Sequence, residues 1–248
     1  LFTNLDLSVA MMTGAIGMLL AILATVPAVR AMASAGHAGF VSTYGLLIAG
    51  IVIGSVIGVV AALKVRMTAM PQMVALFNGF GGGASVLVAG AELLHRSHQG
   101  LPLTLDVAVA TVLSGLIGAV TFWGSLIAYA KLEEFKSFRK PFYYPGQQPI
   151  NAALGLLLLL LAVLSCVYPG SGWLYLALVI VASVLGVTLV NPIGGADMPV
   201  VIAMLNSYSG LAAAATGFVL NNVVLIVAGA LVGAAIPAIV AFGISLWT

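Results

Sequence analysis

Polar side chains that could guide protons occur inside apolar stretches of this sequence. Asn206 stands in the stretch 195–222, within the tetrapeptide Asn206-Ser207-Tyr208-Ser209. If a helix begins near Met198, Asn206 lies about 12 Å along it, well inside a hydrocarbon layer about 30 Å thick. Polar groups at that depth are costly and mark either a pathway or a packed contact. An amide can order water molecules, but it does not titrate and cannot store a proton.

Asn78 and Ser125 are the other polar residues of this kind, in the apolar runs 70–92 and 104–130. The alternative for an asparagine is an interhelical hydrogen bond, which contributes only about 0.6 kcal/mol on average in a membrane. For Ser125 it is a hydrogen bond to the backbone of its own helix. Asn78 and Asn206 occupy matched positions of an internal sequence repeat. This favours a partly hydrated proton path lined by Asn78, Ser125 and Asn206, with Ser207 and Tyr208 beside it.

The ionisable residues lie near the ends of the apolar runs. Asp197 precedes Met198-Pro199, so it either caps a helix or forms a cytoplasmic proton port or a contact for a soluble partner. Glu92 belongs to a charged cluster that is typical of a membrane interface. His37 is the histidine closest to membrane depth, and histidine titrates near neutral pH, but we favour a loop position for it.

Motifs of covalent chemistry are missing from the sequence. It has no Walker motif, no HExxH, no Ser-His-Asp set and no glycine-rich turn after a strand. A single cysteine, Cys166, excludes an internal disulfide and a cysteine-clustered metal site. We therefore expect no catalytic residue, no metal and no bound cofactor in this chain. Its net charge of +2 is too small to indicate nucleic-acid binding.

The amino-acid composition indicates which secondary-structure elements hold these residues in place. The chain is 62% apolar and 6% charged, whereas soluble domains carry roughly a quarter charged residues. We predict an all-α integral membrane protein of about eight transmembrane helices, forming one domain over residues 1–248. Runs long enough to cross a bilayer fall near 9–29, 40–63, 70–92, 104–130, 149–168, 171–190, 198–220 and 223–246.

Basic residues predict the orientation in the membrane through the positive-inside rule. Arg30 and Arg96 fall on one side. The larger group falls on the other side with both termini: Lys64, Arg66, Lys131, Lys136, Arg139 and Lys140. The termini and the charged loop 131–148 are therefore predicted to be cytoplasmic.

An internal repeat supports this layout. Met70-Pro71 matches Met198-Pro199, and Asn78 matches Asn206, with the same offset of 128 residues. Four predicted helices intervene, so the halves, about 9–130 and 149–246, are expected to run parallel as a four-plus-four repeat. The two asparagines would then lie at like depth.

These stretches closely resemble one family, the membrane part of the β subunit of proton-translocating NAD(P) transhydrogenase. The best match is the motif Asp-Met-Pro…Met-Leu-Asn-Ser-Tyr-Ser-Gly, which runs from Asp197 to Gly210. Residues 212–222 and 225–233, with Met67-Thr-x-Met-Pro71 and Gly118–Ser125, also fit. The resemblance covers nearly the whole chain, and its main motif is highly specific.

The resemblance implies a proton-conducting domain of a bacterial inner (plasma) membrane enzyme, acting as a homodimer of protomers. Soluble domains would bind NAD(H) and NADP(H) and transfer hydride between them, and an α subunit would be the partner. Asn206 matches a polar residue of the family's proton path. Asp197 matches an acid at the cytoplasmic face, and Gly229 and Gly233 match glycines of the last helix, which leads into the NADP(H)-binding domain.

Two departures from the family accompany this resemblance. Several members carry a histidine at the position of Asn78, so here either His37 or a helix of the partner subunit would supply the titrating group, and we favour the partner. The family's chain also usually starts with one more helix and continues into the NADP(H)-binding domain, which we expect after Thr248. The alternative to the transhydrogenase interpretation is a stand-alone secondary transporter built from the parallel repeat.

Overall fold

The computed structural model describes residues 45, 48, 51–56, 59, 69–136, 138 and 141–234. The chain divides into two compact units, Leu1–Val65 and Arg66–Thr248, and the described residues of the first are helical. The second contains α3 (Met70–Gln99), α4 (Leu105–Leu132), α5 (Gln147–Val167), α6 (Gly172–Val190), the short 3₁₀ helix η2 (Gly195–Asp197), α7 (Met198–Val219) and α8 (Val223–Gly233). Among the described residues there is no strand, and five helices are long and apolar enough to cross a membrane. The all-α membrane class is therefore confirmed.

The five predicted spans between residues 70 and 220 correspond to α3 through α7. The one clear difference is α3, which continues beyond the predicted end at 92 to Gln99 and stops at Gly100, where φ is +64°. A glycine adopts this left-handed conformation without steric cost and so ends the helix. The spans 9–29 and 40–63 and the end of the span 223–246 lie largely outside the described residues. The count of eight helices and the four-plus-four repeat remain predictions.

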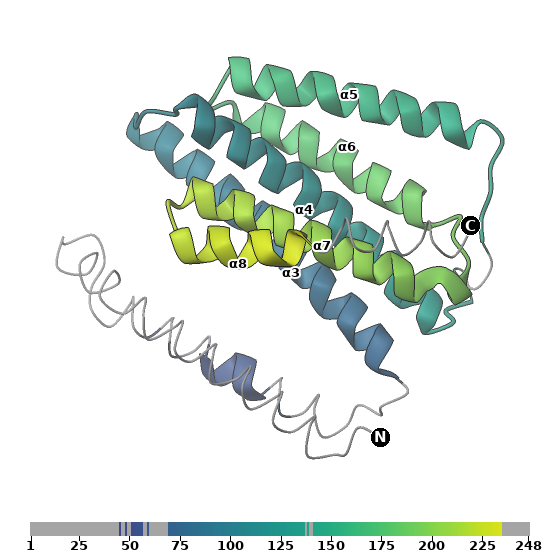
Figure 1. Cartoon of the computed structure of the whole chain (residues 1–248). Helices are drawn as coiled ribbons and strands as arrows, with labels where there is room; N and C mark the ends of the chain where they lie inside the picture. The colour runs from purple at the N-terminus through teal and green to yellow at the C-terminus, as the bar shows by residue number, and fades with distance from the viewer. Residues whose placement is uncertain are drawn as a thin grey trace. The chain divides into compact units, whose positions relative to one another are not determined.

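Helix α4 lies at the centre of the second unit, in contact with α3, α5, α6 and α7 (Figure 1). Its small residues permit this. At Gly82 of α3 and Gly118 of α4 the two backbones approach so closely that a Cβ added to Gly82 would lie 2.8 Å from the Gly118 carbonyl oxygen. Close backbone approach at small residues is the usual way that membrane helices gain packing energy. The α3–α4 interface is therefore tightly closed at its middle.

Helix α5 lies at the edge of this unit, beside α6 (Figure 1). Its central run of leucines is mostly exposed, and Leu158 is the residue that it buries. A helix that is apolar on all sides but hardly buried in protein is suited to face lipid. The polar sites described below lie on the other side of α4, along α3 and α7.

Helices α7 and α8 form a tight antiparallel hairpin. The turn places Asn221 at a φ of +53°, and the Asn222 side chain then accepts a hydrogen bond from the Leu225 backbone N–H at 3.1 Å, which caps α8. Beyond the turn the helices touch through glycines, since a Cβ on Gly210 would lie 2.8 Å from the Gly229 carbonyl oxygen.

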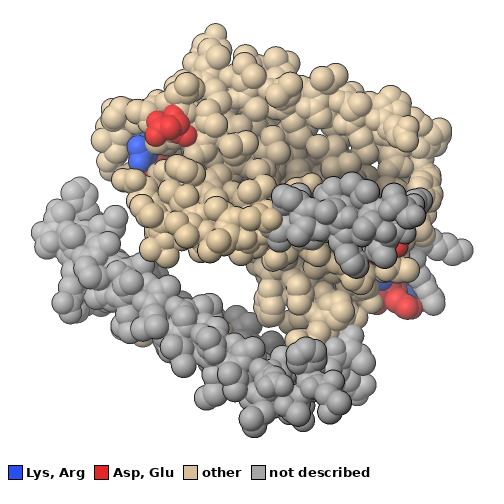
Figure 2. Space-filling view, in the orientation of Figure 1, with Lys and Arg blue, Asp and Glu red and all other residues tan. Residues whose placement is uncertain are grey.

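Charged side chains gather at the ends of the helices of this unit. Figure 2 shows an uncharged band between a charged group near one end of the visible surface and another near the opposite end. The first end carries Glu92, Arg96 and Asp106, and the second carries Lys131, Glu133, Glu134 and Lys136. This distribution fits helices that cross a hydrocarbon layer with their ends in its interfaces.

Candidate functional site

Asn78 is the centre of a buried polar cluster where α3, α4 and α7 meet. Its side chain is only 8% exposed, and its amide nitrogen donates a hydrogen bond to the Ser125 hydroxyl of α4 at 2.9 Å. The Ser209 hydroxyl of α7 donates to the backbone carbonyl oxygen of Asn78 at 3.2 Å. Gly79 opens the space for Ser125, because a Cβ there would lie 3.3 Å from the Ser125 Cβ. Asn78 and Ser125, two of the residues predicted to line the path, are thus in direct contact.

Two oxygen atoms near this cluster have no hydrogen-bond partner. They are Oδ1 of Asn78 and Oγ1 of Thr121, and both are buried. Thr121 precedes Ser125 by one helical turn on α4, and its side chain is fully buried. Leaving a buried polar atom unpaired costs about 1–3 kcal/mol, so both atoms favour an incoming hydrogen-bond donor such as water. The sequence analysis missed Thr121, although its i,i+4 spacing from Ser125 was a usable signal.

Ser209, and not Asn206, is the α7 residue in contact with Asn78. Asn206 is exposed on the described chain and lies one turn earlier on α7. Ser207 is fully buried, but its hydroxyl donates to the Ala203 carbonyl of its own helix at 3.3 Å. Tyr208 packs against the apolar cluster around Ile127 and Leu205. Asn206, Ser207 and Tyr208 therefore do not join the Asn78 cluster.

The register between α3 and α7 explains this difference. Contacting residues Asn78 and Ser209 are 131 residues apart, and Ser85 and Thr216, which Ser114 of α4 connects, have the same separation. A constant offset means that α3 and α7 run parallel, as the repeat predicts. The sequence repeat has an offset of 128, so α7 is displaced by three residues, about 4.5 Å along its axis.

A lysine holds the link between α6 and α7 at the predicted cytoplasmic end. The ammonium group of Lys131, 5% exposed, donates to the carbonyl oxygens of Asn191 at 2.5 Å and Ile193 at 2.8 Å. These carbonyls follow the end of α6, where a helix presents unpaired acceptors and the negative end of its dipole. Lys131 was predicted only as one of several cytoplasmic charges, and its burial was not foreseen.

Asp197 follows this link and is exposed at the start of α7. It occupies the N-cap position, but its side chain accepts no capping hydrogen bond. The capping alternative for Asp197 therefore receives no support from the geometry, and the carboxylate is free to meet solvent or a partner.

The remaining predicted residues fall in two groups. Gly229 and Gly233 are both buried where α8 meets α7 near Gly210 and Leu211. His37 lies outside the described residues. Within the described ranges, no group of three or more His, Cys, Asp or Glu side chains is arranged to hold a metal ion.

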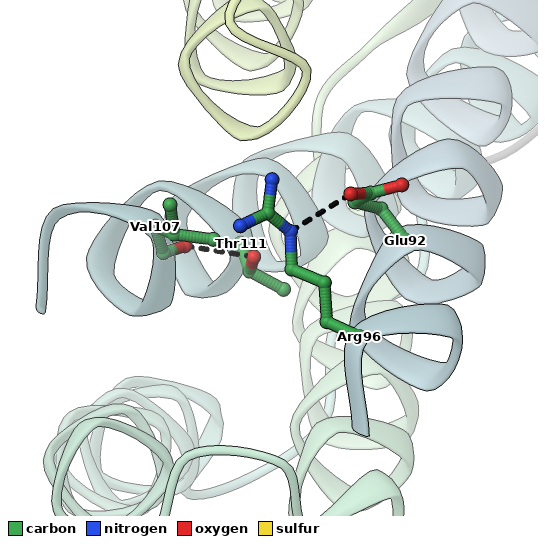
Figure 3. Close-up of polar contacts among 4 residues, drawn as sticks. All are labelled: Glu92, Arg96, Val107 and Thr111. Atoms are coloured by element: carbon green, nitrogen blue, oxygen red, sulfur yellow. Dashed lines mark hydrogen bonds and ion pairs between the residues drawn. The ribbon is translucent and has the colours of Figure 1, made fainter. Parts of the chain in front are cut away.

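At the opposite end of α3, Glu92 pairs with Arg96 at 2.8 Å. Figure 3 shows this pair reaching toward the turn of α4 that carries Thr111, whose hydroxyl donates to the Val107 carbonyl oxygen at 2.8 Å. The pair is partly buried, with 24% of each side chain exposed. Glu92 is therefore one half of an i,i+4 ion pair that faces α4.

Comparison with known proteins gives a consistent result. The sequence matches the family described as NAD(P) transhydrogenase beta subunit over residues 6–239. Two curated relatives named NAD(P) transhydrogenase subunit beta, from Rhodospirillum rubrum and from one of its strains, are each 46% identical to it over 226 residues. These alignments cover 89% of this chain and 46% of each relative, so the chain spans about half the length of the curated relatives it matches.

Proposed function

Because this chain belongs to the NAD(P) transhydrogenase beta-subunit family, we propose that it forms the proton-conducting membrane domain of such an enzyme. Proton flow through the domain is coupled to hydride transfer between NAD(H) and NADP(H), which bind in soluble domains outside residues 1–248. The chain itself contributes no group to the hydride chemistry. The family assignment favours this function over a stand-alone transporter.

The observation that carries the proposal is the buried cluster of Asn78, Ser125 and Ser209. It lies about 12 Å from the start of α3, inside a bundle whose helices are mostly apolar. Two unpaired oxygens, on Asn78 and Thr121, leave places where a water molecule can bind. Since polar groups in a membrane interior usually line a pathway, this is where a proton would cross the bundle.

The titrating group must lie outside this cluster, because amides and hydroxyls do not ionise near neutral pH. A histidine is the side chain suited to that task. His37 or a histidine from a helix of the α subunit would take this role, and we favour the α subunit. Asn206 is exposed on α7 one turn from Ser209, so it is open to contact with a histidine of a partner helix.

Coupling would pass through the predicted cytoplasmic end. Asp197 is exposed and uncapped, so it can contact the NADP(H)-binding domain expected after Thr248. Lys131 ties α4 to the link that precedes Asp197. At Gly210 and Gly229 the backbones of α7 and α8 are in close contact, so a shift of α8 would move α7 with it. A change in NADP(H) occupancy would then bias the position of α7, which is what coupling between two sites requires.

The test uses the complete enzyme, with its α subunit and soluble domains, reconstituted in liposomes. Their lipids are those of an inner (plasma) membrane, which is the location that we propose. Hydride transfer from NADH to an NADP analogue is followed with and without an imposed proton gradient. The gradient should accelerate the reaction, and Asn78→Leu should remove the acceleration. Asn151→Leu is the matched control, because Asn151 lies on α5, which takes no part in the Asn78 cluster. If the proton gradient still accelerates hydride transfer in Asn78→Leu, the proposal is wrong.

A further inference from the structure

A second polar layer lies seven residues beyond the Asn78 cluster along α3 and α7. Its residues are not among the predicted site residues. The Ser114 hydroxyl of α4 lies 2.7 Å from the Thr216 hydroxyl of α7 and 3.1 Å from the Ser85 carbonyl oxygen of α3. Ser114 is fully buried, and Thr216 is 4% exposed. The layer therefore joins the same three helices as the Asn78 cluster, at a greater depth.

These residues belong to one continuous face of α4. Five buried residues of α4 follow one another at intervals of three or four: Thr111, Ser114, Gly118, Thr121 and Ser125. All of them except Gly118 carry a hydroxyl. This spacing places them in a single row along the helix. A buried apolar interface has no need of hydroxyls in such a row, and the unpaired Oγ1 of Thr121 shows that hydrogen bonding within the protein does not account for all of them.

The hydrogen atoms of Ser114 and Thr216 have two alternative arrangements. The pair has two hydroxyl protons for three possible hydrogen bonds: one between the two hydroxyls, one from Ser114 to the Ser85 carbonyl at 3.1 Å, and one from Thr216 to the Ala212 carbonyl at 2.9 Å. In one arrangement Ser114 donates to Ser85 and Thr216 donates to Ser114. In the other, Thr216 donates to Ala212 and Ser114 donates to Thr216. The other two arrangements are unfavourable, because they place either no proton or two protons between oxygens that are 2.7 Å apart.

We propose that Ser114 and Thr216 form a hydroxyl relay that carries protons between the Asn78 cluster and the end of the bundle at Glu92 and Arg96. This rests on the proposed function. When Thr216 receives a proton from water, its own proton passes to Ser114, and Ser114 releases its proton to water on the other side. Each hydroxyl forms one O–H bond and breaks one, so nothing is oxidised or reduced. Rotation between the two arrangements then resets the pair.

The surroundings give the relay a path on both sides. Thr121 lies on α4 between Ser114 and Ser125, with its unpaired oxygen buried. On the far side, Thr111 is one turn from Ser114 on α4, and the Glu92–Arg96 pair lies on α3 beyond Ser85. The contact of Gly82 with Gly118 closes the interface between the two layers, so water reaches the relay only when α3 and α4 move apart slightly.

The test compares two substitutions of Thr216 in the complete reconstituted enzyme. Thr216→Val keeps the side-chain shape and removes the hydroxyl, whereas Thr216→Ser keeps the hydroxyl and removes the methyl group. A relay predicts that Val lowers proton uptake per unit time about tenfold or more, while Ser retains it. Ser114→Ala should behave like Thr216→Val. Ser183→Ala is the control, since that hydroxyl donates only within α6, to Val179.

Thermal unfolding of each variant separates a relay from a structural hydrogen bond. The relay predicts that Thr216→Val loses proton uptake with a melting temperature within about 4 °C of the parent. If uptake falls only in proportion to stability in both Thr216→Val and Ser114→Ala, the pair is structural and the relay is overturned. If Asn78→Leu blocks uptake but Thr216→Val does not, the relay fails and the proposed function stands. If neither blocks uptake, both fail.

Discussion

The amide nitrogen of Asn78 and the hydroxyl oxygen of Ser125 face each other across the α3–α4 interface at 2.9 Å. Both side chains are buried, and Gly79 provides the space for their contact. Removing Ser125 therefore leaves both polar atoms of the Asn78 amide unpaired.

Ser125→Ala should lower proton uptake and reduce the stability of the complex by about 0.6–1.7 kcal/mol, the range measured for interhelical hydrogen bonds in a membrane. Proton uptake in liposomes and thermal unfolding are the two measurements. Ser165→Ala on α5 serves as the control, because that buried hydroxyl has no partner to lose. Equal behaviour of the two variants would show that the Asn78–Ser125 contact has no role.

Gly82→Ala should destabilise the bundle by about 1–3 kcal/mol, the usual cost of overpacking. Its Cβ would lie 2.8 Å from the Gly118 carbonyl oxygen, which cannot move without shifting α4. Gly81→Ala is the matched control on the adjacent residue, since nothing lies within 4 Å of a Cβ there. Alanine is the better helix former, so Gly81→Ala should be neutral or slightly stabilising. A similar melting temperature for both variants would contradict the close helix contact.

Lys131→Met should destabilise the complex by about 1.5–3 kcal/mol, because hydrogen bonds to a charged group are stronger than average. The loss would leave the Asn191 and Ile193 carbonyls without their donor. Lys131→Arg should recover part of the stability, since a guanidinium can still donate to both. Lys136→Met, at an exposed position, should change the melting temperature little. If Lys136→Met is as harmful as Lys131→Met, the effect is one of net charge.

Asn206→Leu and Asn78→Leu should differ in their effect on stability. Both should abolish coupled proton transfer. Asn206 is exposed on the described chain, whereas Asn78 is 8% exposed and hydrogen-bonded to Ser125. Thermal unfolding should therefore show a lower melting temperature for Asn78→Leu but not for Asn206→Leu. Normal proton transfer in Asn206→Leu would remove that residue from the path.

The sequence was sufficient to predict the helices of the second unit, because long apolar runs and the Met-Pro starts of α3 and α7 have few alternatives in a membrane. It also singled out Asn78 and Ser125, which the structure joins by a hydrogen bond, whereas their place in a proton path remains a prediction. It could not predict the three-residue displacement between α3 and α7, because the register of two helices depends on how their side chains pack in three dimensions. That displacement puts Ser209 in the place expected for Asn206.

Lys131 shows the same limit at the helix ends. A basic residue after an apolar run predicts a cytoplasmic position, but the sequence does not say whether the side chain turns toward water or toward the end of a neighbouring helix. The buried position of Lys131 follows from the packing of α4 against the α6–α7 link. Likewise, the hydroxyls of Ser114 and Thr216 are visible in the sequence, but only the fold pairs them.

The most direct test of the account measures protons and hydride together in the reconstituted enzyme. A pH-sensitive dye inside the liposomes records proton uptake while absorbance records hydride transfer, for the parent enzyme, Asn78→Leu and the control Asn151→Leu. The account predicts that Asn78→Leu loses proton uptake, while the parent and the control take up protons in step with hydride transfer. Proton uptake in Asn78→Leu at the parent's ratio to hydride would contradict a path through the Asn78 cluster.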